Sequence, residues 1–195
     1  MSKAEKTKQF ILEKTAPIFN TKGYAGTSLN DMTEATGLTK GSIYGNFENK
    51  DEVALAAFDY NLTKVGRIIK REMDKHELIK DKLLVYVRVY EDYKNLDFPE
   101  GGCPILNTAI EADDTHPELK KRAADAIYNW KKIIVKLVER GIASGEFHKN
   151  TDAQQLALGM IAAIEGGIMV AKITGKQGYL TGVMQLVERM ITELK

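Results

Sequence analysis

The chain has 195 residues, enough to bury a hydrophobic core without disulfides or a structural metal. Charged residues make up 28% and hydrophobic residues 44%, which excludes a disordered or collagen-like chain, and a net charge of +1 points to no particular partner. The single cysteine, Cys103, excludes an intrachain disulfide.

Every element that the sequence predicts is a helix. Apolar residues recur with a period near 3.6 in each long segment, and no run alternates apolar and polar residues as a strand would. The sequence therefore predicts an all-α fold of about nine helices and no strands. The expected helices cover residues 3–22, 28–36, 39–46, 49–75, 77–96, 105–113, 115–144, 151–174 and 179–194.

Two residues interrupt the pattern of the first helix. Pro17 removes one backbone hydrogen bond, so we expect a kink or tightened turns there. Gly23 follows Lys22 and suits the residue that lies just beyond a helix end. The first helix is therefore expected to kink or tighten at Pro17 and to stop before Gly23.

Residues 28–47 have the pattern of a helix-turn-helix. Ser28 and Asp31 have the spacing of a capping box, and Gly37 ends the first short helix. Five apolar residues suit two short helices that share a core: Leu29, Met32, Ala35, Leu38 and Ile43. Such helix pairs also occur in proteins that never touch DNA, so this pattern alone leaves open a helical interaction protein.

The outward face of the second short helix carries side chains that suit DNA. Lys40 can neutralise a phosphate, and Ser42 and Tyr44 can donate hydrogen bonds to phosphate oxygens. Asn46 can read adenine through two hydrogen bonds. The small residue Gly41 allows the backbone to approach a groove closely.

One long stretch resembles the N-terminal DNA-binding region of the TetR family of transcriptional repressors: Gly23 to Phe58, which reads GYAGTSLNDMTEATGLTKGSIYGNFENKDEVALAAF. The matching elements are Gly23-Tyr24, Thr27-Ser28, Gly37-Leu38, Lys40-Gly41-Ser42-Ile43-Tyr44, Phe47 and Asn49-Lys50-Asp51-Glu52. The resemblance covers roughly residues 8–58, and beyond them only the number and length of the helices agree.

The resemblance implies a helix-turn-helix DNA-binding domain over residues 1–47 and an effector-binding and dimerisation domain over residues 48–195. It implies that Lys40, Gly41, Ser42, Tyr44 and Asn46 belong to the recognition helix and its approach to DNA.

Three further positions follow from the same resemblance. Thr27 and Ser28 match the start of the preceding helix, near backbone phosphates, and Lys50 matches a lysine that touches phosphate. Gly45 is a departure, because many relatives carry a histidine there, and it is the first place to look for an unusual operator preference.

Aromatic residues gather in the helix predicted over residues 77–96. Tyr86, Tyr90 and Tyr93 lie on one face of this helix, which is apolar around most of its circumference and must therefore be central. A ligand can supply the partner that a buried tyrosine hydroxyl needs, although simple core packing is the alternative. Three further residues are candidates for the same pocket: Phe98, Trp130 and Met169.

The last two helices, over residues 151–174 and 179–194, are apolar on more than one face. Gly159 and the pair Gly166-Gly167 allow a close approach of helices. Core packing is the simplest interpretation, and the resemblance adds a homodimer with a four-helix interface. A two-fold dimer places its recognition helices about 34 Å apart and favours a palindromic operator.

Cys103 offers an alternative function. It precedes Pro104 at the start of a predicted helix, and a helix N-terminus can lower the pKa of a thiol and make it reactive. The alternative is therefore a redox- or electrophile-responsive regulator.

Acidic residues and a histidine cluster at one helix junction, at Glu111, Asp113, Asp114 and His116. Metal ligation needs converging geometry, and capping of the next helix by Asp114 or Thr115 is the simpler interpretation. The sequence holds no Ser/His/Asp set, phosphate-binding glycine loop or paired-histidine motif, so we expect neither an enzyme nor a cofactor.

Together with these observations, the resemblance implies a ligand-responsive repressor that releases palindromic operator DNA when an unknown small molecule binds the C-terminal domain. The N-terminus has no apolar core of a signal peptide. No stretch approaches about 18 uninterrupted apolar residues, so no membrane helix is expected. We therefore expect a cytoplasmic protein.

Overall fold

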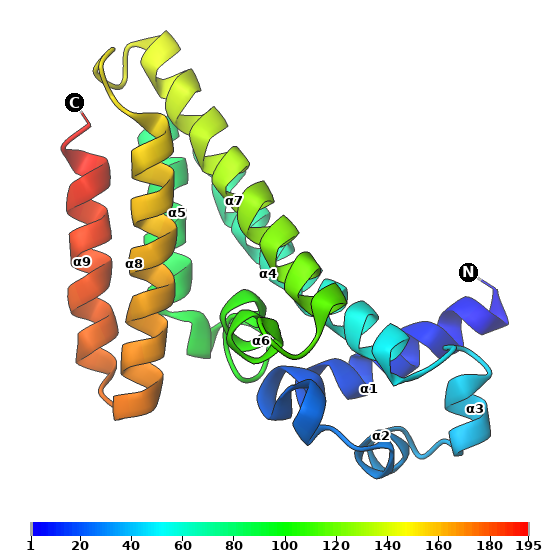
Figure 1. Cartoon of the computed structure of the whole chain (residues 1–195). Coiled ribbons are helices and arrows are strands. Elements are labelled where there is room, and N and C mark those ends of the chain that lie inside the picture. The colour runs from blue at the N-terminus through cyan, green and yellow to red at the C-terminus, as the bar shows by residue number, and fades with distance from the viewer. Residues whose placement is uncertain (1, 195) are drawn as a thin grey trace. The chain divides into compact units, whose positions relative to one another are not determined.

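The structure is a computed structural model that describes residues 2–194. Within these residues the chain forms nine α-helices and one short 3-10 helix, Tyr93–Asn95, and no strand (Figure 1). The all-helical prediction is confirmed. The helices are α1 Lys3–Gly26, α2 Leu29–Thr36, α3 Lys40–Tyr44, α4 Lys50–Met73, α5 Ile79–Glu91, α6 Pro104–Ala112, α7 Pro117–Ser144, α8 Ala153–Thr174 and α9 Gln177–Thr192.

The helices group into two compact units. The first unit holds the chain up to Val65 together with Pro99–Ala124, and the second holds Gly66–Phe98 and the chain from Asp125 onward. The long helices α4 and α7 each begin in the first unit and end in the second. These units do not test the predicted boundary after residue 47 between a DNA-binding domain and an effector-binding domain, and that boundary stays a prediction.

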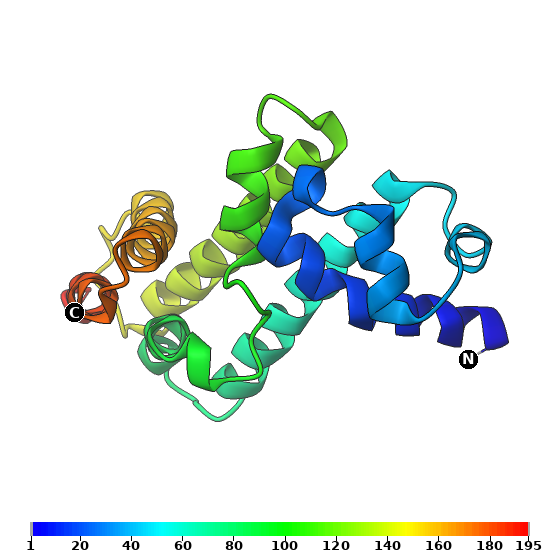
Figure 2. The ribbon, with the colours of Figure 1, turned by 90° about the horizontal axis from the view of Figure 1, so that it is seen from below.

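The first unit is built around α1. Helix α1 packs against α2 and against α6, and Figure 2 shows α6 beside the end of α1. Ser2 and Ser28 each begin a helix with a capping box, as the spacing of Ser28 and Asp31 predicts. The core of this unit is formed by buried apolar residues: Ile11, Ala16, Phe19, Met32, Ile43, Phe47, Val53 and Phe58.

The break in α1 lies at Gly23 and not at Pro17. Gly23 is the non-helical residue inside α1, with φ +75° and ψ 179°, and the helix resumes for one more turn to Gly26. The regular part of α1 therefore stops before Gly23, as predicted, and the backbone at Pro17 stays helical, so the kink expected there is absent. A glycine can adopt this backbone conformation at little cost, and α1 continues past it because α6 supports the last turn, as described below.

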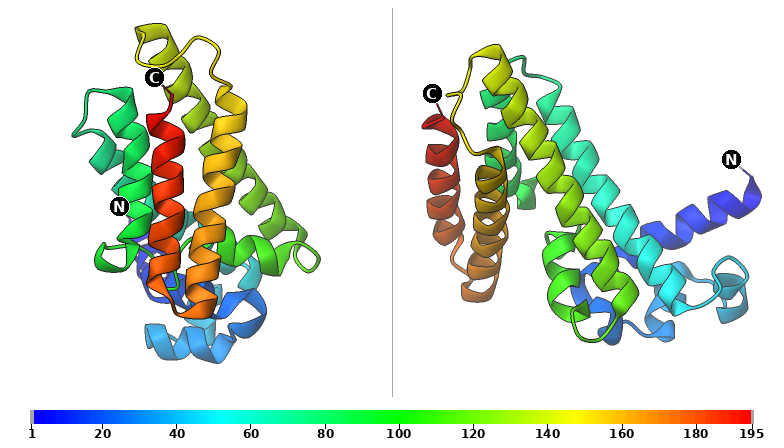
Figure 3. Two further views of the ribbon diagram at one scale, coloured as in Figure 1. Left: turned by 90° about the vertical axis from the view of Figure 1, so that its left-hand side faces the viewer. Right: turned by 45° about the horizontal axis from the view of Figure 1, so that its top comes forward.

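The second unit contains α5, α8 and α9. Helices α8 and α9 pack side by side, and α5 packs against α9 (Figure 3). Gly167 permits this close approach, because a Cβ atom there would lie 3.0 Å from Cγ1 of Val183. Six buried residues of α8 and α9 form the shared core: Ile164, Ile168, Leu180, Met184, Val187 and Ile191.

Two helix boundaries differ from the predicted ones for a local reason. Helix α5 ends at Glu91 instead of continuing to residue 96, because Asp92 starts a turn in which its carbonyl accepts the Asn95 N–H at 2.9 Å. Helix α7 is capped by His116, whose Nδ1 accepts the Leu119 N–H at 3.3 Å, and not by Asp114 or Thr115. The His116 ring is buried and meets the Tyr24 ring edge-on.

Candidate nucleic-acid interface and effector site

The helix-turn-helix is held together by short-range caps. The Asp31 N–H donates to Oγ of Ser28 at 3.1 Å, and the Ser28 N–H donates to the Asp31 carboxylate at 2.7 Å. Gly37 ends α2 with φ +67°, a left-handed conformation that favours glycine. The Ser42 N–H then donates to Oγ1 of Thr39 at 3.2 Å, which starts α3. Residues 28–44 therefore form two short helices joined by a tight turn.

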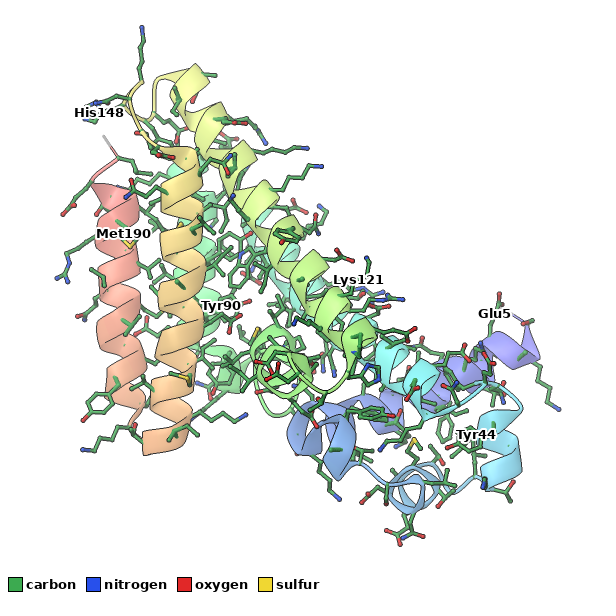
Figure 4. All side chains as sticks on the ribbon, in the orientation of Figure 1. Glu5, Tyr44, Tyr90, Lys121, His148 and Met190 are labelled. Atoms are coloured by element: carbon green, nitrogen blue, oxygen red, sulfur yellow. The ribbon has the colours of Figure 1, made fainter. Side chains whose placement is uncertain are left out.

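The predicted recognition helix presents the predicted face. Ile43 of α3 and the nearby Phe47 are buried, while Lys40, Gly41 and Gly45 are exposed. Ser42, Tyr44 and Asn46 are half-buried, and Figure 4 marks Tyr44 on α3.

The side chains on this face interact with one another. The Lys40 amine lies 6.0 Å from the centre of the Tyr44 ring. Asn46 donates from Nδ2 to the Ser42 carbonyl at 2.9 Å and so steadies the end of α3. The face exposes one lysine, one tyrosine edge and bare backbone at two glycines, which is a surface that can approach a phosphate backbone closely.

Thr27 and Ser28, the two positions at the start of α2, differ in exposure. Thr27 is fully buried, and its hydroxyl donates to the Gly23 carbonyl at 2.6 Å. Ser28 is exposed, and its hydroxyl donates to the Asp31 carboxylate at 2.6 Å. The Lys22 amine also contacts Asp31 at 2.5 Å, and these bonds hold the pKa of the Asp31 carboxyl well below its usual range. Ser28 is thus the exposed member of the pair.

Lys50 lies in a cluster at the start of α4. Its amine lies 4.4 Å from the centre of the Tyr24 ring, close enough for a cation–π interaction. The Tyr24 hydroxyl donates to the Asp51 carboxylate, which raises the pKa of Tyr24 to about 12. The His116 ring meets the Tyr24 ring edge-on, with 4.5 Å between their centres. The predicted phosphate-binding lysine is therefore held by an aromatic residue of α1.

The candidate effector residues fall into a connected aromatic group in the second unit. Trp130 stacks on Tyr90 with 5.5 Å between ring centres, and Tyr86 lies 5.8 Å from Trp130. Phe98 meets both Tyr90 and Tyr93 edge-on. Tyr90, marked in Figure 4, is thus in contact with both Trp130 and Phe98.

The residues of the predicted pocket differ in how deeply they are buried. Burial raises the pKa of the Tyr86 hydroxyl, and Tyr93 is only half-buried. The buried Trp130 Nε1 lies beside the Tyr86 hydroxyl and makes no hydrogen bond of good geometry. Met169 lies on α8 with 45% of its side chain exposed, so its place in the pocket gains no support.

The surroundings of Cys103 do not suit a redox sensor, and those of the acidic cluster do not suit a metal site. Cys103 is 1% exposed, and a buried thiol of this kind is poorly accessible to oxidants and electrophiles. Among residues 2–194, no three His, Cys, Asp or Glu side chains gather into a group that could hold a metal ion. Glu111 instead accepts hydrogen bonds from the backbone of α1.

The sequence does not show that Tyr24, Glu111 and His116 belong to the cluster around Lys50. Gly23-Tyr24 is visible as a motif, but its role depends on Lys50 and Asp51, which are far along the chain. Glu111 is 87 residues away from Tyr24, and no local pattern announces that contact.

Helices α8 and α9 expose a large apolar surface. Six of their apolar residues have at least 39% of their side chains exposed: Leu158, Met169, Val170, Ile173, Tyr179 and Leu186. By length and composition alone, α8 could also cross a membrane, a test that core helices of other proteins pass as well. Exposed apolar patches on helices that already pack together are typical of protein–protein interfaces.

Two family models match the chain. Residues 80–187 match the one described as "Tetracyclin repressor-like, C-terminal domain", which is more than half of the chain. Residues 11–57 match "Bacterial regulatory proteins, tetR family".

Solved structures and curated proteins agree with these matches. A TetR-family transcriptional regulator from Cytophaga hutchinsonii is 49% identical with a TM-score of 0.97, over 100% of this chain and 98% of that chain. A TetR transcriptional regulator from Chloroflexus aurantiacus J-10-FL is 41% identical with a TM-score of 0.92, over 98% and 97% of the two chains. The HTH-type transcriptional repressor DhaR from Mycobacterium sp. (strain GP1) is 25% identical over 85% of this chain and 82% of its own.

Proposed function

Because this chain belongs to the TetR family of bacterial transcriptional regulators, we propose that it is a repressor that binds palindromic operator DNA as a homodimer and releases it when a small molecule binds. The similarity to a named repressor supports this direction of control. We place the protein in the cytoplasm, where its operator lies, and we assign it no enzymatic activity.

The exposed face of α3 is the observation that carries the DNA-binding proposal. Lys40 and Lys50 bind phosphates, and Ser42 and Tyr44 donate to phosphate or base edges. Asn46 reads a base from the end of α3. Gly41 and Gly45 bring the backbone close to DNA, and Gly45 supplies no side chain that could select a base. Ser28 and the backbone at Thr27 lie at the N-terminus of α2, where amides favour an anion.

The apolar surface of α8 and α9 supports the homodimer. These helices bury one face against each other and expose another that carries Leu158, Val170 and Ile173. A second copy of the same surface would cover those side chains and form a four-helix interface. Two recognition helices held in this way fit successive major grooves about 34 Å apart.

The aromatic group of the second unit supports a small-molecule effector. Its members are Tyr86, Tyr90, Tyr93, Phe98 and Trp130, and a flat apolar compound can replace one ring contact with its own. The effector favours a conformation in which the two heads no longer match the grooves, so DNA affinity falls. Helix α4 is the first helix of the proposed effector and dimerisation domain, residues 48–195, and directly follows the candidate head, residues 1–47, so it would pass the change to the head.

A gel-shift titration against the DNA upstream of the protein's own gene tests the DNA-binding proposal. Lys40→Ala and Tyr44→Ala should each weaken binding by about tenfold, because each removes a contact from the recognition helix. Lys149→Ala is the matched control, since Lys149 is an exposed lysine outside the head. Equal affinity of all three variants and the parent would sink the site assignment, and a parent that binds no DNA would favour a helical interaction protein.

A further inference from the structure

Glu111 of α6 holds the backbone of α1 at two adjacent amides. Its Oε2 accepts the Tyr24 N–H at 2.8 Å, and its Oε1 accepts the Ala25 N–H at 2.8 Å. These amides begin the last turn of α1, just after the break at Gly23, where helix amides have no partner one turn earlier. A carboxylate is well suited to this place because hydrogen bonds to a charged acceptor are short and strong.

Gly23 is shaped around this carboxylate. A Cβ atom on Gly23 would lie 2.3 Å from Oε2 of Glu111, and the φ of +75° is one that other residues rarely adopt. The two hydrogen bonds and the missing side chain thus belong to one arrangement.

The same segment of the chain also binds α1 one turn earlier. Asn20, which is 5% exposed, donates from Nδ2 to the carbonyls of Glu100 at 2.7 Å and Gly102 at 3.0 Å. Asn107 donates from Nδ2 to the Asn20 carbonyl at 3.0 Å. Glu111 is therefore the last of a row of contacts that fix α1 to α6, and it is the one next to Tyr24.

Tyr24 carries the arrangement onward to Lys50. Its ring contacts both the Lys50 amine, 4.4 Å from the ring centre, and the His116 ring, with 4.5 Å between the ring centres. Its hydroxyl donates to Asp51, the neighbour of Lys50 at the start of α4. The position of the Tyr24 backbone consequently determines the position of the ring that the Lys50 amine contacts.

We propose that Glu111 is a positioning residue for DNA binding: by holding Tyr24, it places the Lys50 amine where it meets a phosphate of the operator. This inference rests on the proposed function, since it needs Lys50 to touch DNA. Glu111 itself stays away from DNA and acts only through Tyr24.

Glu111→Gln tests the proposal with little change in shape. An amide offers one oxygen in place of two, and its NH2 group would face a backbone N–H. We expect operator affinity to fall by about tenfold and the slope of log affinity against log salt to flatten by about 1 for each protomer, as for Lys50→Ala. Asp114→Asn is the matched control, because it removes one exposed carboxylate nearby and should leave both quantities unchanged.

A double-mutant cycle separates positioning from general destabilisation. When Lys50 is already replaced by alanine, Glu111→Gln should lower operator affinity by less than about twofold. The measurement is made at low salt, so that the weakened binding stays detectable. Tyr24→Leu keeps both amides but removes the ring face, and it should likewise lower affinity in the parent but not in the Lys50→Ala background. This variant keeps the test available if Glu111→Gln fails to fold.

The two possible failures are distinguishable. One outcome is that the affinity losses of the single variants multiply in the double variants and the salt slopes are unaltered. That outcome would overturn the positioning role of Glu111, although the parent would still bind its operator. A parent that binds no operator would instead overturn the proposed function.

Discussion

At Gly23 the backbone has φ +75° and ψ 179°, and the space beside its Cα is filled by the Glu111 carboxylate. Gly23→Ala should therefore lower the free energy of unfolding by at least about 2 kcal/mol, through backbone strain and the displaced carboxylate. Urea denaturation followed by circular dichroism measures this change in the free energy of unfolding.

Gly66 provides the control for that substitution. It lies inside α4, and a Cβ atom there would meet nothing within 4 Å. Gly66→Ala should raise stability by up to about 1 kcal/mol, because alanine favours a helix interior. If Gly23→Ala stabilised the protein as well, the account of the break in α1 would be wrong.

The hydroxyl of Tyr24 gives a second test at a single residue. Its hydrogen bond to Asp51 raises its pKa to about 12, so the bond contributes stability below the ordinary tyrosine pKa, and this contribution is lost as pH rises through the raised value. Asp51→Asn should bring the Tyr24 pKa back toward its ordinary value. A pH titration of ring-labelled tyrosine by NMR shows this shift, and an unchanged Tyr24 signal would mean that Asp51 is not its partner.

At the scale of elements, the caps that the sequence predicts correctly are those closed by neighbouring residues. Ser28, Asp31 and Gly37 interact within one short segment, so their pattern is readable without the fold. The turn of α1 after Gly23 and the packing of His116 against Tyr24 depend on residues brought from elsewhere in the chain. The sequence therefore predicts the recognition helix and its exposed face, but not the cluster that supports Lys50.

The cap of α2 yields a prediction at this scale. Ser28→Ala should lower stability by about 1 kcal/mol, because the Asp31 N–H loses its acceptor, whereas Ser28→Gly should cost only a few tenths. Thermal denaturation of the two variants measures the difference. Equal melting temperatures would show that the Ser28 hydroxyl is not a working cap.

At the scale of the whole molecule, the number and order of helices follow from periodicity alone, because each long helix has its own apolar stripe. The aromatic face of α5 is equally visible, and the structure joins its tyrosines to Phe98 and Trp130. The exposure of Met169 is not visible in the sequence, since an apolar residue on a nearly all-apolar helix has no marked face.

The homodimer is tested at the same scale. Leu158→Glu places a charge in the exposed apolar surface of α8, and it should convert the dimer to a monomer and abolish tight operator binding. Light scattering after size-exclusion chromatography gives the mass. Tyr128→Glu, at a still more exposed residue of α7, is the control and should remain dimeric; a dimeric Leu158→Glu variant would place the interface elsewhere.

The central claim is that two copies of α3 read one operator. Hydroxyl-radical footprinting on the upstream DNA tests it most directly. We expect two protected patches on one face of the duplex, about 34 Å apart and related by two-fold symmetry, and we expect Tyr44→Ala to weaken both together. A single patch, an unprotected duplex, or a footprint that Tyr44→Ala leaves unchanged would contradict it.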